Sequence, residues 1–158
     1  MTQNFINTQF PIYGGSYIAQ FKLGETRSGV PTLEVEMAPT VGSGQNRKGL
    51  WEKKSAFQFK PETELVLLGQ LFVGKVSSVK FDYHGPQNNK SFYAARNQDN
   101  TISINLREGK EKSFSVVAEA SSQFHLLMMT CKPLAIRHMT DLNTVANFLR
   151  VVPVNLKK

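Results

Sequence analysis

Apolar and polar residues alternate along most of the chain, the pattern of strands that bury one face. Residues 16–23 and 32–38 alternate in this way and predict two strands, each followed by a turn or loop that contains Gly. Residues 1–15 carry only scattered apolar positions and predict a loosely ordered N-terminal arm.

Four further alternating segments lie between residues 76 and 118, separated by short turns rich in Gly, Asn and Asp. In the first of them, Val79, Phe81 and Tyr83 are expected on one face because they stand two residues apart. Four short strands with tight connections predict an antiparallel meander.

The period becomes helical in two parts of the chain. Pro61 to Gly74 predicts a short helix, and a longer helix is expected from Ala120, with Pro133 kinking or interrupting it. A last short helix is expected within residues 140–158, which end in a basic tail. The order strands, helix, strands, helix predicts an α+β fold with antiparallel sheets, with one domain over residues 16–139.

The stretch Gln45 to Lys60, QNRKGLWEKKSAFQFK, combines five cations and one carboxylate with Trp51, the single tryptophan. Alternation from Trp51 onward predicts a strand with Phe57 and Phe59 on its buried side. Cations beside a flat aromatic side chain suit a single-stranded nucleic acid, whose phosphates they bind while the ring stacks on a base. The alternative is a solvated lysine edge that prevents aggregation, with Trp51 in the core.

The net charge of +7 and a sequence pI of about 9.6 favour a polyanionic partner. No apolar run approaches the roughly 20 residues of a membrane-spanning helix, and the N-terminus resembles neither a secretory signal nor a transit peptide. These features predict a cytoplasmic protein that does not bind membranes.

Catalytic chemistry has little support in the sequence. Cys131 is the single cysteine, so neither an intrachain disulfide nor a cysteine-based zinc site is expected. The three histidines are dispersed, and His125 is interpreted as a structural residue of the long helix. We therefore predict a protein that is not an enzyme and has no metal or cofactor.

Several segments together resemble the Whirly family of single-stranded DNA-binding proteins, within the wider group that includes the PC4 coactivator fold and the kinetoplastid guide-RNA-binding proteins. The similarity spans about residues 12 to 139 and suggests a bacterial or phage-type member. It rests on the order of IYGGSYIAQF, LEVEMAP, LWEKKSAFQF, PETELVLLGQL, VKFDYHGP and EKSFSVVAEASSQFHLLMMTCKPL. The family's KGKAAL motif is replaced here by GGSYIA, which lacks its lysines.

The resemblance implies two antiparallel sheets packed crosswise, and helices that assemble subunits into a homo-oligomer, a tetramer. It also implies a non-catalytic, sequence-tolerant single-stranded DNA-binding protein of DNA replication, recombination or repair, which binds the strand along sheet edges. The alternatives are an RNA-binding protein of the same fold, an OB-fold single-strand binder, and a protein–protein interaction module whose charge is incidental. The candidate nucleic-acid-binding residues, basic for phosphates and aromatic for bases, are Tyr17, Lys22, Arg47, Lys48, Trp51, Lys53, Lys54, Lys80, Tyr83, Lys90, Tyr93, Arg96 and Arg107.

Overall fold

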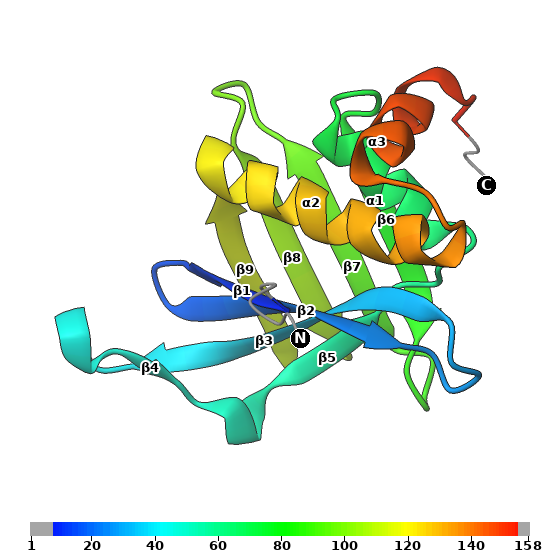
Figure 1. Ribbon diagram of the computed structural model, residues 1–158. Helices are drawn as coiled ribbons and strands as arrows, with labels where there is room; N and C mark the ends of the chain where they lie inside the picture. The colour runs from blue at the N-terminus through cyan, green and yellow to red at the C-terminus, as the bar shows by residue number, and fades with distance from the viewer. Residues whose placement is uncertain (1–7, 155–158) are drawn as a thin grey trace, which may run out of the picture.

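The computed structural model describes residues 8–154, in which two antiparallel sheets cross each other and share a core with three helices (Figure 1). This is the predicted α+β architecture, with a short helix between the two runs of strands. The two separate sheets exclude the OB-fold alternative, which requires a single Greek-key barrel. The start of the predicted arm, residues 1–7, and the end of the basic tail, residues 155–158, lie outside the described residues.

The first sheet is built around a long central strand, to which two short strands pair in succession. Its strands are β1 (Gln9–Tyr13), β2 (Tyr17–Glu25), β3 (Pro31–Val41), β4 (Lys48–Gly49) and β5 (Ser55–Gln58). The strand order is β1-β2-β3, and both β4 and β5 pair with β3.

Strand β1 lies within the stretch that the sequence assigned to a loosely ordered arm. It pairs with β2 along its whole length and buries Ile12 in the core, so the sheet begins at Gln9. The sequence did not predict this strand because the strand is short and because Pro11 has no backbone N–H to donate. An edge strand accepts a proline because one side of it needs no ladder partner.

The basic stretch also differs from its prediction, because a strand does not begin at Trp51. Trp51–Lys53 forms a short 3₁₀-helix, and the extended segment starts only at Ser55. From there the expected alternation holds, and Phe57 and Phe59 are both buried.

The second sheet is the predicted meander, with the strand order β6-β7-β8-β9. Its strands are β6 (Ser78–His84), β7 (Lys90–Arg96), β8 (Ile102–Glu108) and β9 (Lys112–Ala118). One face of this sheet is apolar and buried, and it packs on the first sheet and on the helices.

A β-bulge between Phe81 and His84 reverses the faces predicted for the end of β6. Tyr83 takes a left-handed conformation with φ of 65° and is 79% exposed, whereas the sequence placed it on the same face as Val79 and Phe81, which are buried. His84 turns inward instead. Its ring stacks on Phe57 at a centroid distance of 3.9 Å, and its Nε2 lies 2.7 Å from Oε2 of Glu64.

The helices cover the part of the second sheet that the first sheet leaves open (Figure 1). They are α1 (Glu64–Phe72), α2 (Ala120–Arg137) and α3 (Leu142–Val151). Helix α2 continues through Pro133, where the sequence predicted a kink or an interruption. Helix α3 packs on α1 at Gly69, where an added Cβ would lie 2.7 Å from Cδ1 of Leu149. The C-terminal helix is therefore part of the same core rather than an appendage.

Candidate nucleic-acid interface

The outer face of the second sheet carries a row of polar and aromatic side chains that crosses all four strands. Lys80 on β6 pairs with Tyr93 on β7, Tyr93 with Asn105 on β8, and Asn105 with Ser115 on β9. Directly paired residues of an antiparallel sheet share a face, and neighbouring strands are about 4.8 Å apart. The row therefore runs at right angles to the strands.

A second row lies one step along the same face. Arg107 on β8 pairs with Ser91 on β7 and with Ser113 on β9, and Asp82 on β6 lies beside them. Residues of both rows line a shallow hollow of about 520 Å³. The first row contributes Lys80, Tyr93 and Asn105, and the second contributes Asp82, Ser91, Arg107 and Ser113. We call this hollow the sheet-2 hollow.

The charged groups of the sheet-2 hollow are open to a ligand. The Lys80 side chain is 65% exposed, and its ammonium lies 3.9 Å from the nearest carboxylate oxygen of Asp82. Arg107 is exposed and makes neither a hydrogen bond nor an ion pair with its side chain among residues 8–154. Tyr93 is 43% exposed and lines the same hollow, on the strand between those of the two cations.

In contrast, two of the candidate lysines on the first sheet are paired with a carboxylate. The ammonium groups of Lys22 and Lys54 lie 3.2 Å and 2.6 Å from the two oxygens of Glu36. Burial raises the pKa of Glu36, but the hydrogen bonds from the two lysines outweigh burial and hold that pKa below its ordinary value. Lys22 also lies 3.7 Å from Oε1 of Glu34, so both lysines are engaged in ion pairs within the fold.

Arg47 fastens two loops of the first sheet together. Its guanidinium donates hydrogen bonds to the carbonyl of Gly14 and to the hydroxyl of Thr40, and it lies 5.4 Å from the centre of the Tyr13 ring. These contacts join the β1–β2 turn to the loop that follows β3. The residue acts structurally in this conformation.

Two candidate cations of the second sheet likewise bind the protein's own carbonyls. Lys90 Nζ donates to the carbonyl of Ala56 at 2.9 Å, which links β7 to β5. Arg96 donates to the carbonyl of Leu71 at 2.9 Å and to Oε1 of Gln123 at 3.0 Å, which ties β7 to α1 and α2.

The remaining candidates are exposed to different degrees. Lys48 and Lys53 are exposed, and neither side chain has a hydrogen-bond or ion-pair partner within the described part of the chain. Trp51 is half-buried, and its indole packs over Gly49, where an added Cβ would meet it at 3.0 Å. Tyr17 is also half-buried, with its ring edge-on to Phe114 at 5.6 Å.

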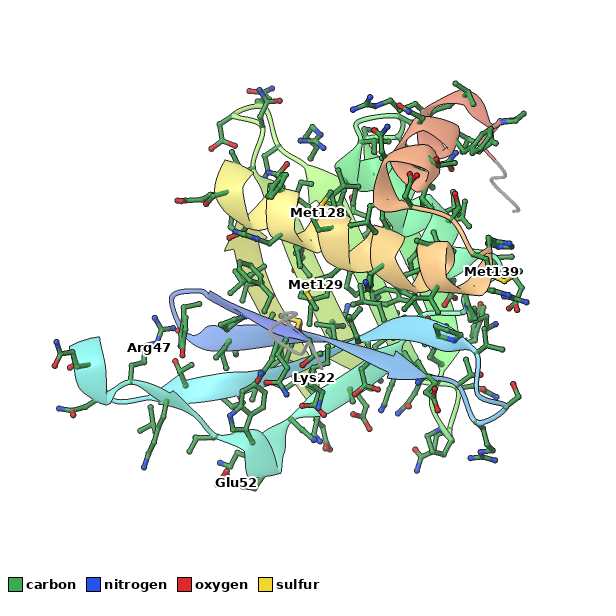
Figure 2. All side chains as sticks on the ribbon, in the orientation of Figure 1. Lys22, Arg47, Glu52, Met128, Met129 and Met139 are labelled. Carbon is green, nitrogen blue, oxygen red and sulfur yellow. The ribbon has the colours of Figure 1, made fainter. Side chains whose placement is uncertain are left out.

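Figure 2 shows Lys22 and Arg47 on the side of the molecule formed by the first sheet. The thirteen candidates therefore do not form one site. Lys80, Tyr93 and Arg107 come together in the sheet-2 hollow, with Tyr83 at the end of β6.

Sequence reasoning missed several residues of the sheet-2 hollow. Asn105, Ser91, Ser113 and Asp82 line it, but none of them was selected. Alternation places them on the solvent face, and that signal alone does not separate a binding surface from an ordinary polar one.

Other kinds of site find no support in residues 8–154. They contain no group of three or more His, Cys, Asp or Glu side chains suited to a metal ion. Among these residues, no helix is long and apolar enough to cross a membrane. Cys131 is buried, and its burial raises the pKa of the thiol to about 11.

Comparison with known proteins finds similarity in structure but not in sequence. No protein-family model matches the chain, and no curated protein matches it in sequence. The crystal structure of Trypanosoma brucei MRP1/MRP2 aligns with a TM-score of 0.62 and 8% sequence identity, over 85% of this chain and 88% of that one. At this identity the likeness shows a shared fold.

Proposed function

We propose that this protein binds single-stranded nucleic acid, single-stranded DNA in the first place, on the outer face of the β6–β9 sheet and without catalysing a reaction. The observation that carries the proposal is the sheet-2 hollow. It combines two exposed cations, Lys80 and Arg107, with the half-exposed ring of Tyr93 and a single carboxylate.

The chemistry of this surface matches a single strand better than a duplex. Lys80 and Arg107 supply charge for phosphates, and the Tyr93 ring supplies a flat surface on which an unpaired base can stack. The short side chain of Ser91, two residues from Tyr93 on the same strand, also lines the hollow and leaves room for a base beside the ring. In a duplex the base faces are already stacked on one another and are not available to the ring.

The exposed cations outside the hollow extend the positive surface. Lys112 on β9 donates to the carbonyl of Lys54 at 3.3 Å, so the basic stretch of the first sheet lies against the β8–β9 end of the second. Lys48 and Lys53 are exposed on that basic stretch. We propose that they hold phosphates of a strand that continues beyond the hollow.

The experiment is a fluorescence-anisotropy titration with a labelled mixed-sequence oligonucleotide, offered as single-stranded DNA, duplex DNA and single-stranded RNA. We expect tight binding of single strands and weak binding of the duplex. Comparable affinity for DNA and RNA strands would agree with stacking as the main contact, since stacking does not distinguish them. No binding at low salt would refute the proposal and favour the protein–protein module.

We also propose that the protein forms a homo-oligomer through its α2–α3 face, which we define by Ile136, Met139, Phe148 and Val151. These apolar side chains are between 53% and 93% exposed, and one of them, Phe148, lines an apolar groove of about 420 Å³. Met139 projects at the end of α2 (Figure 2). Large exposed apolar patches mark interaction sites, and a second copy would cover this one.

Light scattering of the wild type and of Phe148→Glu tests this assembly. We expect an oligomer for the wild type and a smaller species for the variant, with circular dichroism showing that the variant is folded. A monomeric wild type would refute the assembly without touching the nucleic-acid proposal.

A further inference from the structure

An exposed tyrosine stands beside the sheet-2 hollow, at the bulge in the edge strand β6. Tyr83 is 79% exposed and takes a left-handed backbone conformation with φ of 65°. We propose that Tyr83 is a second stacking platform for the bound strand, and that it takes the base next to the one that lies on Tyr93. This inference rests on the proposed function and extends it from one base to two successive bases.

The left-handed conformation makes a tyrosine an unusual residue at this position. Among residues 8–154, the residues other than Gly with a positive φ are Tyr83, Asn88, Asn100 and Met139. Asparagine is tolerated in this conformation, whereas a bulky side chain is strained there. The Tyr83 ring does not offset the strain by burial, because most of it is in solvent. Strained residues of this kind cluster at binding sites, where the side chain serves a ligand and not the fold.

Buried contacts next to the bulge hold Tyr83 at the surface. Its neighbour His84 turns inward, where its ring stacks on Phe57 at 3.9 Å and its Nε2 lies 2.7 Å from Oε2 of Glu64. Bulges commonly re-aim a side chain beside a functional site. A base that stacks on Tyr83 therefore meets a backbone that is already fixed, so little chain entropy is lost on binding.

The register of the sheet places Tyr83 near the base on Tyr93. The bulge sets two residues of β6, Asp82 and Tyr83, opposite one residue of β7, Ser91. Ser91 lines the hollow and stands two positions from Tyr93 on the same strand. With about 4.8 Å between strands and about 3.3 Å per residue along them, the backbones of Tyr83 and Tyr93 lie roughly 8 Å apart. Two rings at this spacing can take successive bases of an unstacked strand.

The test removes the ring without adding strain or removing charge. Tyr83→Asn introduces a residue that tolerates the left-handed conformation, whereas Tyr83→Phe keeps the ring. The matched control, Tyr13→Asn, removes a tyrosine of the first sheet that is 54% exposed. Each variant is titrated by fluorescence anisotropy with a labelled mixed-sequence single-stranded DNA of about 12 nucleotides, across a salt series.

We expect Tyr83→Asn to bind about tenfold more weakly than the wild type, in the lower part of the range for one stacked base. Its salt slope should not change, because no phosphate contact is lost. Tyr83→Phe and Tyr13→Asn should keep the wild-type affinity. The melting temperature of Tyr83→Asn should equal or exceed that of the wild type, because the strain is relieved. A loss of affinity in this variant then cannot come from a damaged fold.

The double variant Tyr83→Asn, Tyr93→Leu should lose affinity by the product of the two single losses, since each ring takes a different base. Wild-type affinity in Tyr83→Asn would overturn the second platform, and a loss in Tyr93→Leu alone would leave the proposed function standing. A tenfold loss in Tyr83→Phe would also overturn the platform, because that variant retains the ring. A wild type that binds no single strand would refute the proposed function and this inference together.

Discussion

Removing the two exposed cations of the sheet-2 hollow provides a quantitative test of the proposed binding surface. The perturbation is the double variant Lys80→Gln, Arg107→Gln. If each side chain neutralises one phosphate, the log–log slope of affinity against salt becomes shallower by about 1.4, at about 0.7 per contact. The same relation predicts a loss of affinity of about 25-fold at 0.1 M salt and about fivefold at 0.3 M salt.

The matched control is the double variant Lys22→Gln, Lys54→Gln, which removes the same net charge from the first sheet. Because Lys22 and Lys54 are already paired with Glu36, and Lys22 also with Glu34, we expect affinity and salt slope close to those of the wild type. The cost appears in stability instead. Glu36 is 9% exposed and loses both partners, which destabilises the fold by about 2 kcal/mol.

The assay is fluorescence anisotropy with one single-stranded oligonucleotide across a salt series, and chemical denaturation gives the stability of each variant. The hollow variant should lose affinity and keep its stability, because its two side chains are exposed. Equal losses of affinity in the two double variants would refute the reasoning. They would show that binding follows total charge and not position.

Three further predictions concern the fold. His84→Ala removes the stack on Phe57 and the hydrogen bond to Oε2 of Glu64, so chemical denaturation should show a loss of about 3 kcal/mol. A loss below about 1 kcal/mol would contradict a stabilising role for this buried contact. The lowered pKa of Glu36 adds stability that is complete above the ordinary pKa of 4.5 and is lost as the pH falls through the folded-state pKa. Glu36→Gln should therefore flatten the acid limb of a curve of unfolding free energy against pH. An unchanged acid limb would exclude this contribution. Burial and a pKa of about 11 predict that a thiol reagent labels Cys131 slowly at neutral pH and rapidly after unfolding, and rapid labelling of the folded protein would argue against that burial.

The alternation of apolar and polar residues was sufficient to predict the meander of β6 to β9. Each of these strands buries one face and exposes the other, so the pattern in the sequence reflects the environment directly. The same rule gave the wrong face for Tyr83. A β-bulge adds a residue to one strand and so shifts the alternation of faces by one position. The partner of the inward-facing His84 is Glu64, which lies 20 residues earlier and could not be identified from the local pattern.

The basic residues of the candidate site were easy to find but difficult to rank from sequence. Lys54 is paired with Glu36, which lies 18 positions earlier and reaches it only because β5 pairs with β3. Arg96 is held by a carbonyl of α1, a contact that depends on how the helix packs. Sequence alone therefore overestimates the number of free cations, because the partners that neutralise them come from other elements.

Cross-linking is the most direct test of the central claim that a single strand lies on the outer face of the β6–β9 sheet. A single-stranded oligonucleotide carrying a photoreactive halogenated uracil would be irradiated on the protein, and the attached peptide would be identified by mass spectrometry. The account predicts attachment to Tyr93 in β7, and its loss in Tyr93→Leu. Attachment confined to Trp51 and the first sheet, with none to β6–β9, would contradict it and would move the binding surface to the first sheet.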